Sequence, residues 1–132
     1  MMEQKTPVKV LLLENDPDIT EKIQQALGNG SYETTCYTNC IEALEASGTT
    51  LFNLVISGHN AEHRDPVEVM KDFVMTSPMS SIIMVTDLSD SEVEEKAEGY
   101  GILGNISRNV PVENLFTLLN TYEEIQQSLS RK

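Results

Sequence analysis

The residues of this chain with the greatest capacity for chemistry close or follow short apolar runs. They are Glu14, Asn15, Thr86, Asp87 and Arg108. Carboxylate and amide oxygens can bind a hard cation such as Mg²⁺, and an arginine can hold a carboxylate through two parallel hydrogen bonds. We therefore expect Arg108 to pair with Glu14 or with Asp87 wherever the fold brings the ends of these runs together.

The cysteines and a histidine are weaker candidates for a functional site. Cys36 and Cys40 are four positions apart with no histidine within ten residues, so a zinc site lacks its other ligands. We expect one thiol on a strand and the other near a helix start. His59 lies in a polar stretch, where a single histidine is usually solvated.

Composition narrows the class of protein. The 132 residues suffice for one domain, and a 39% hydrophobic content excludes a disordered chain. Nine Lys plus Arg against 21 Asp plus Glu give a net charge of −12, which disfavours direct binding to nucleic acids or anionic membranes. No apolar run approaches the ~20 residues that span a bilayer, and no signal peptide is recognisable, so we expect a cytoplasmic protein.

Apolar runs alternate with segments of helical periodicity along the whole chain. Asp16 is the expected N-cap of the first helix and Gly28 its end, Thr38 or Asn39 opens the second helix, and Asp90 or Ser91 opens the fourth. The expected strands are Val8–Leu13, Tyr32–Tyr37, 51–57, Ser81–Thr86 and 102–107, and the expected helices are 17–27, 41–46, 66–76, 90–99 and one that begins at Pro111.

Five strand–helix units in succession predict an α/β protein of flavodoxin-like (βα)5 type. The expected fold is a single domain with a doubly wound, five-stranded parallel sheet in the order 2-1-3-4-5. The functional crevice of such a sheet lies at the carboxyl ends of its strands. The residues that line it should come from 14–17, 58–66, 86–90 and 107–111.

The amino-acid sequence of these segments resembles that of the receiver domain of bacterial two-component response regulators, from residue 8 to about 122. Residues 10–19 are similar to the strand that ends in the family's acidic pair, and residues 53–57 to the strand that leads to its phosphoacceptor aspartate. Residues 65–68 are similar to the start of its third helix. Residues 82–86 are similar to the strand that ends in its signalling threonine or serine, and 97–110 to the stretch that ends in Lys-Pro-Phe.

The chain departs from the family pattern where the resemblance implies chemistry. Gly58 stands at the phosphoacceptor position, and Asn15 replaces one carboxylate of the acidic pair. Arg108 stands at the lysine position, followed by Asn109 where the family has proline. Asn105 stands at the position of the switch aromatic. The resemblance therefore implies a degenerate phosphorylation pocket.

Of the pocket positions, Glu14 and Thr86 keep their chemical type. Phosphoryl transfer uses Mg²⁺ to bridge the acceptor carboxylate and the transferred oxygens, and Glu14 alone is a weak ligand. We therefore expect no cofactor, lost or weak Mg²⁺ binding and no enzymatic activity. Because removing clustered carboxylates relieves their repulsion, the altered site should also be more stable than one with Asp at position 58.

Two alternatives remain open for the pocket. In the first, the chain still accepts a phosphoryl group through Asp87 or His59 while Glu14 holds Mg²⁺. In the second, the space left by the missing side chain at Gly58 binds a small ligand. That second hypothesis predicts a concave pocket beside Gly58.

If phosphorylation is lost, function must reside on a binding surface. The helix expected at 90–99 carries five carboxylates against a single Lys96. In receivers this helix, the fifth strand and the last helix dimerise or contact output partners, so the resemblance assigns Glu94, Glu95, Glu98 and Asn105 to an interaction face. The acidic charge suggests a basic partner.

The last helix is expected to extend this interaction face. Tyr122, Ile125 and Leu129 continue its helical apolar spacing beyond what is needed to cover the sheet. They are expected to pair with a second helix, from a sister chain or an output domain. The expected organisation is a flexible tail at 1–7, a receiver-like domain at 8–122 and an extension of the last helix at 123–132. The expected partner is a protein, namely a histidine kinase, an output domain or a sister subunit.

Overall fold

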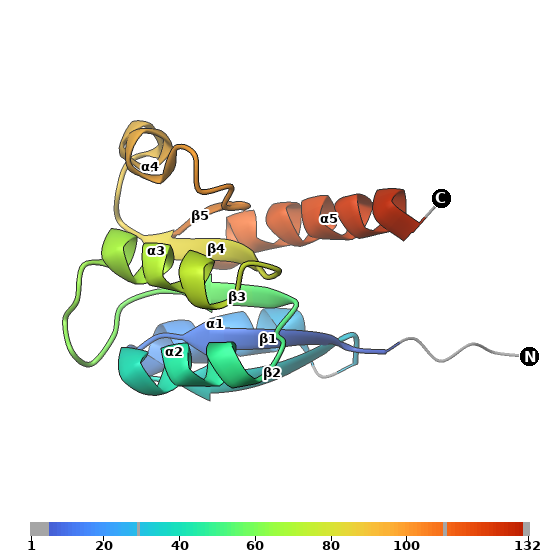
Figure 1. Ribbon diagram of the computed structural model, residues 1–132, viewed down its shortest axis with the longest axis horizontal. Helices are drawn as coiled ribbons and strands as arrows, with labels where there is room; N and C mark the ends of the chain where they lie inside the picture. The colour runs from blue at the N-terminus through green and yellow to red at the C-terminus, as the bar shows by residue number, and fades with distance from the viewer. Residues whose placement is uncertain (1–5, 29, 110, 131–132) are drawn as a thin grey trace, which may run out of the picture.

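The computed structural model contains one parallel sheet with the strand order β2-β1-β3-β4-β5 (Figure 1). The structure describes residues 6–28, 30–109 and 111–130. Residues 1–5 of the expected tail and residues 131–132 at the other end lie outside this description. The strands are β1 (Val8–Leu13), β2 (Tyr32–Tyr37), β3 (Leu54–Ser57), β4 (Ser81–Thr86) and β5 (Gly104–Ser107). The predicted flavodoxin-like fold and strand order are confirmed.

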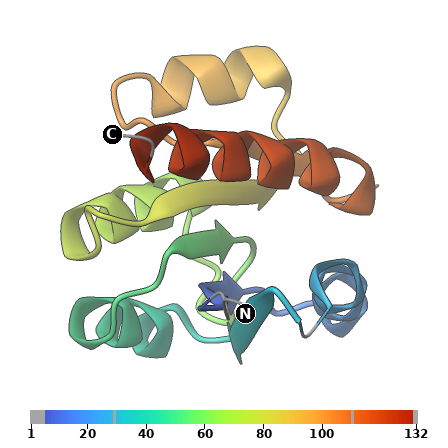
Figure 2. The same cartoon turned by 90° about the vertical axis from the view of Figure 1, so that its right-hand side faces the viewer.

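Helices cover both faces of this sheet (Figure 2). One apolar cluster joins the sheet to α1 and α5, and a second joins the opposite face to α2 and α3. The helix α4 stands away from the sheet in Figure 1. The bounds are α1 (Pro17–Leu27), α2 (Cys40–Thr49), α3 (Pro66–Thr76), α4 (Asp90–Ala97) and α5 (Pro111–Ser130).

The central strand β1 explains why the sheet forms where the sequence is most apolar. Its residues Val10 through Leu13 are each 0% exposed, because β1 pairs with β2 and β3 and is covered on both faces. Among the described residues, no helix combines the length and the apolar character that crossing a bilayer requires.

Local signals fix most helix ends. The Asp16 carboxylate accepts a hydrogen bond from the Asp18 amide, and Gly28 ends α1 with a positive φ of 70°. Asn39 caps α2, as one of the two expected residues. The expected cap of α4 at Asp90 or Ser91 is wrong. Ser89 is the N-cap, because it forms a reciprocal capping box with Glu92.

Several predicted boundaries also differ from the structure, including the start of α2 at Cys40 instead of residue 41 and the end of α4 at Ala97 instead of residue 99. α2 continues through Ser47 and Gly48 to Thr49, since the buried Ser47 hydroxyl bonds the Leu44 carbonyl and the Thr76 hydroxyl of α3. β3 begins at Leu54 instead of residue 51, after Asn53, whose side-chain oxygen accepts from the Lys9 amide. β5 begins at Gly104 instead of residue 102, after a turn in which Gly101 has a φ of 70°.

Candidate functional site

Parallel pairing brings four chain segments together at the carboxyl edge of the sheet. Leu13 of β1 pairs with Ser57 of β3, so Glu14 and Gly58 leave the sheet side by side. The Gly58 amide donates to the Leu13 carbonyl at 2.7 Å. Thr86 of β4 pairs with Ser107 of β5, which places Arg108 at the same edge.

Arg108 and Glu14 form a bidentate ion pair across this edge. Nη1 of Arg108 lies 2.6 Å from Oε1 of Glu14, and Nη2 lies 2.7 Å from Oε2. The side chain of Arg108 is 9% exposed and that of Glu14 is 0% exposed. Of the two pairings expected for Arg108, the structure shows the one with Glu14.

Each Glu14 oxygen also accepts a backbone hydrogen bond. The Asp16 amide donates to Oε2 at 2.9 Å, and the His59 amide donates to Oε1 at 3.2 Å. Both oxygens therefore have two donors, as a buried carboxylate requires. The Glu14 carboxylate is therefore held by hydrogen bonds from the protein itself.

The guanidinium of Arg108 is correspondingly held in its charged form. Its pKa is raised above the ordinary value mainly by the hydrogen bond to Glu14, against the opposing effect of burial. The charges of Glu14, Asp87 and Asp16 raise this pKa further. Arg108 thus supplies a positive charge beside the carboxylates of Glu14, Asp87 and Asp16 at this edge of the sheet.

Gly58 is the residue that makes room for this ion pair. A Cβ atom at position 58 would overlap Oε1 of Glu14 and lie 3.3 Å from Nη1 of Arg108. A side chain at position 58 and the ion pair in its present position therefore exclude each other. The Glu14 carboxylate fills the space beside Gly58 in which the small-ligand hypothesis expected a concave pocket.

Thr86 and Asn105 form a second contact near the same edge. The Thr86 hydroxyl donates to Oδ1 of Asn105 at 2.7 Å and accepts from the Leu88 amide at 3.2 Å. Thr86 is buried and Asn105 is partly buried. The hydroxyl at this position is thus engaged with both β5 and the loop that leads to α4.

Asn60 organises the loop between β3 and α3, and sequence analysis missed it. Its buried side chain accepts from the Arg64 amide at 2.9 Å and donates to the Arg64 carbonyl at 3.2 Å. The Asn15 side chain donates to the Asn60 carbonyl at 3.3 Å. The signal was present in the asparagine itself, which commonly bonds nearby backbone in tight loops.

The remaining pocket candidates and the acidic carboxylates are exposed. Asp87 and His59 are both exposed, and so are Glu94, Glu95 and Glu98 of the α4 region. Among the described residues, no group of three or more His, Cys, Asp or Glu side chains is arranged to hold a metal ion.

The expected apolar face on the last helix needs one correction. Ile125 and Leu129 are exposed, at 42% and 60%. Tyr122 is only 4% exposed and belongs to the core cluster between the sheet, α1 and α5, so the prediction that it is available to a partner is wrong. The Tyr122 ring packs inward because the sheet still lies beneath this turn of α5.

The chain is similar to one known regulatory protein in sequence and to several solved structures in fold. No family model matches the sequence. The transcriptional regulatory protein CrdR of Helicobacter pylori is 26% identical over 111 residues, which are 81% of this chain and 51% of that protein. The chain therefore spans about half the length of this relative.

Solved structures show the likeness in shape. A signal receiver domain of an HD domain-containing protein from Pseudomonas fluorescens has a TM-score of 0.78 at 22% identity, covering 100% of this chain and 96% of that one. A CheY-like receiver domain from Methanospirillum hungatei has 0.77 at 20% identity, covering 93% and 99%. The chemotaxis regulator CheY4 of Vibrio cholerae has 0.76 at 24% identity, covering 89% and 99%. The fold of this chain is that of the CheY-like response regulator receiver domains.

Proposed function

We propose that this chain is a receiver-like module of a two-component phosphorelay system that signals through protein–protein contacts and does not accept a phosphoryl group at the end of β3. The receiver fold and the similarity to a transcriptional regulatory protein support the signalling role. The single observation that carries the proposed loss of phosphorylation is the Glu14–Arg108 ion pair over Gly58.

Two features at the end of β3 oppose phosphoryl transfer. Position 58 has no side chain that could become phosphorylated. Transfer also needs a divalent cation whose oxygen ligands are free to coordinate it, and each oxygen of Glu14 already has two hydrogen-bond donors. Releasing Glu14 to a cation would leave Arg108 without its partner in a nearly buried position, which is costly.

The proposed output is a surface with one lasting conformation. Arg108 connects the end of β5 to the end of β1, and Thr86 is tied to Asn105. The segments that follow β1, β4 and β5 are thereby held without a bound phosphoryl group. A partner protein, whether kinase, output domain or sister subunit, would meet this surface in the same state at all times.

The direct test is to incubate the protein with acetyl phosphate and Mg²⁺ and to weigh the intact chain. A receiver with an aspartate at the end of its third strand serves as the positive control. We expect the mass of this chain to stay unchanged. A gain of one phosphoryl group would contradict the proposal, and loss of that gain in Asp87→Asn or His59→Gln would identify the acceptor.

A further inference from the structure

The strand β2 forms one margin of the sheet and has a free edge. The sheet order places β2 beside β1, and among the described residues no strand pairs with its other side. Figure 2 shows β2 at this margin, with α1 on one side of it and α2 on the other. Three of its six residues are exposed, so the two helices leave much of this edge uncovered.

The hydrogen bonds between β1 and β2 show which backbone groups point outward. The Val8 amide donates to the Ser31 carbonyl at 2.8 Å, and the Glu14 amide donates to the Tyr37 carbonyl at 2.9 Å. In a parallel ladder the N–H and C=O of one residue point to the same side, and those of the next residue point to the opposite side. Odd-numbered residues of β2 therefore face β1. The residues whose backbone groups point away from the sheet are Tyr32, Thr34 and Cys36.

A groove runs along this free edge, between β2 and α1. It consists of two adjoining hollows of about 780 and 640 Å³, which share Glu21 and Gln24 of α1 as wall residues. Tyr32 and Thr34 line the first hollow, and Cys36 lines the second. The three residues with outward backbone groups thus all lie in the groove, which has room for a chain beside β2.

Thr34, in the middle of the free edge, carries a polar group that the protein does not satisfy. Its hydroxyl oxygen is buried and has no hydrogen-bond partner among the described residues. A buried polar group without a partner costs free energy, and such groups are rare in folded proteins. A polar group of a strand added beside β2 would supply the missing hydrogen bond.

The sequence of β2 lacks the features that usually keep an edge strand from pairing. Such strands commonly carry a proline, a lysine or a bulge that prevents another strand from adding to them. β2 reads Tyr-Glu-Thr-Thr-Cys-Tyr, and its register with β1 is regular from end to end. Its six residues also exceed the four of β5, the other edge strand. β2 is thus the edge of this sheet that is better suited to pair with a further strand.

The charge of the groove determines which strand would fit. Asp18, Glu21 and Glu33 line it, in addition to Glu14 of the ion pair. The lining residues, all of them within the described part of the chain, include no Lys, Arg or His. A second copy is a poor match, because it would bring the same carboxylates and a net charge of −12 to this edge. A strand with Lys or Arg side chains complements the groove.

From these features we infer that the free edge of β2 binds an extended, basic segment of a partner protein, which adds to the sheet as a further strand. The backbone of the segment pairs with the outward N–H and C=O groups of β2, and its cationic side chains lie at the carboxylates of the groove. The inference rests on the proposed function, since it gives a binding mode and a partner chemistry to a module that signals by protein contacts. This surface is separate from the face expected at α4 and β5, because β2 and β5 are opposite edges of the sheet.

The first test uses a short fluorescein-labelled peptide in which Lys and Val alternate, titrated into the full chain. Fluorescence anisotropy gives its Kd, and amide hydrogen exchange followed by NMR gives its location. We expect the amides of Thr34 and Cys36 to exchange quickly in the free chain and to become protected when the peptide binds, because they point outward and gain an acceptor. A peptide with Glu in place of Lys should bind at least about tenfold more weakly.

Two versions of the peptide that are N-methylated at alternate residues separate backbone pairing from attraction between charges. A methyl group removes an N–H donor and blocks close approach on the side to which that N–H points. One version should therefore lose binding, and the other, which is methylated on the side away from β2, should keep it. Equal affinities of the two versions would overturn the inference.

Thr34→Pro is the corresponding change in the protein. Proline is tolerated on an edge strand where the replaced N–H points to solvent, as that of Thr34 does. We expect an unchanged circular dichroism spectrum and peptide binding weakened by about tenfold or more, because a donor is lost and the ring lies in the path of the added strand. Glu21→Gln/Glu33→Gln should weaken binding by about threefold or more, since two exposed charge pairs are lost.

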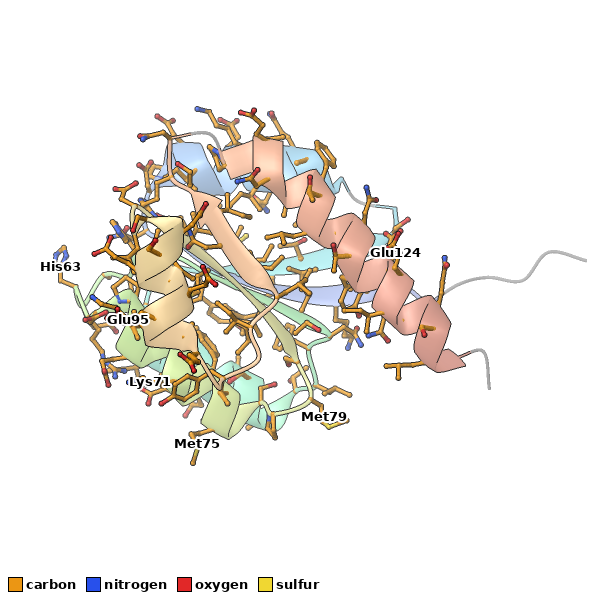
Figure 3. The ribbon with its side chains drawn as sticks, turned by 90° about the horizontal axis from the view of Figure 1, so that it is seen from above. His63, Lys71, Met75, Met79, Glu95 and Glu124 are labelled. Carbon is orange, nitrogen blue, oxygen red and sulfur yellow. The ribbon has the colours of Figure 1, made fainter. Side chains whose placement is uncertain are left out.

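The matched control is Glu95→Gln/Glu124→Gln, which removes the same charge from exposed positions of α4 and α5. Figure 3 shows both residues on these helices, which lie at the opposite end of the molecule from β2 in Figure 1. Equal weakening in both double variants, or no protection at β2, would overturn the inference. Protection of the same amides that rises with protein concentration in the absence of peptide would overturn it in favour of a second copy as occupant. The phosphorylation test is independent of this result, so either idea can fail alone.

Discussion

Gly58 and the Glu14–Arg108 ion pair occupy the same small volume at the end of β3. The Glu14 carboxylate lies where a side chain at position 58 would begin, and it is buried there with four donors around its oxygens. A carboxylate added at this position would need both space and a counter-charge. Arg108 already gives its two bidentate hydrogen bonds to Glu14.

This conflict predicts the effect of restoring a side chain at position 58. Gly58→Ala tests the steric overlap alone and should lower the free energy of unfolding by about 1–3 kcal/mol. Gly58→Asp adds a buried negative charge beside Glu14 and should cost about 3 kcal/mol or more. Urea unfolding followed by circular dichroism measures both variants. If the Gly58→Asp variant were as stable as the wild type, the ion pair would not depend on the glycine.

The sequence predicted the residues of this site but not how they pair. Asp87 follows β4, which neighbours β5, so adjacency alone would favour it as the partner of Arg108. The guanidinium instead reaches the residue after β1, because Gly58 leaves space over the end of β3. The contact of Thr86 with Asn105 and the role of Asn60 likewise depend on side-chain geometry that spacing does not contain.

At the scale of the elements, the loop between β3 and α3 contacts two helices through its side chains, capping α2 and forming an ion pair with α3. Glu62 lies in the loop between β3 and α3, and its carboxylate accepts from the Cys40 amide at 2.9 Å and from the Ile41 amide at 3.4 Å. These amides belong to the first turn of α2, whose own residues cannot satisfy them. Arg64 of the same loop pairs with Asp72 of α3 at 2.7 Å.

The cap at Glu62 predicts a pH dependence of stability. The backbone hydrogen bond from Cys40 is the main cause that lowers the pKa of Glu62 below its ordinary value of 4.5. A lowered pKa in the folded state means that the ionised cap contributes its stability above pH 4.5, and that this contribution is lost as pH falls through the lower folded value. Glu62→Gln keeps an acceptor oxygen but removes the charge.

The expected result is a wild type that is more stable than Glu62→Gln at neutral pH, with a difference that shrinks as the pH falls below 4.5. Thermal melts across this pH range measure the difference. Glu45→Gln, at an exposed position of α2, is the control for the loss of one negative charge. A difference that is constant across the whole range would show that the charge of Glu62 does not cap α2.

Element order was predictable from sequence, whereas several boundaries depended on tertiary contacts. The apolar runs and the caps Asp16 and Gly28 specified the strand–helix alternation. The extension of α2 through Ser47 was not predictable, because it depends on a hydroxyl contact with Thr76 on another helix. β5 is shorter than predicted because the chain turns at Gly101, so the apolar residues Ile102 and Leu103 that follow lie outside the strand.

At the scale of the whole molecule, the elements are unequally buried. The strand β1 lies at the centre of both apolar clusters, since Val10 and Leu12 face one layer of helices while Leu11 and Leu13 face the other. The helix α4 buries a single alanine and is otherwise exposed or partly exposed along its length. Local stability follows buried apolar contact, so these two elements should open at very different free energies.

Hydrogen exchange can measure this difference. Amides of β1 should exchange only through global unfolding, and those of α4 should exchange through a local opening at least about 3 kcal/mol lower in free energy and insensitive to low urea. Equal protection of α4 and β1 would contradict this ordering. Separate opening of α4 would leave the Glu14–Arg108 ion pair closed, because this pair joins the residues that follow β1 and β5 and does not involve α4. The same fold would then combine a permanently fixed carboxyl edge with one adjustable surface.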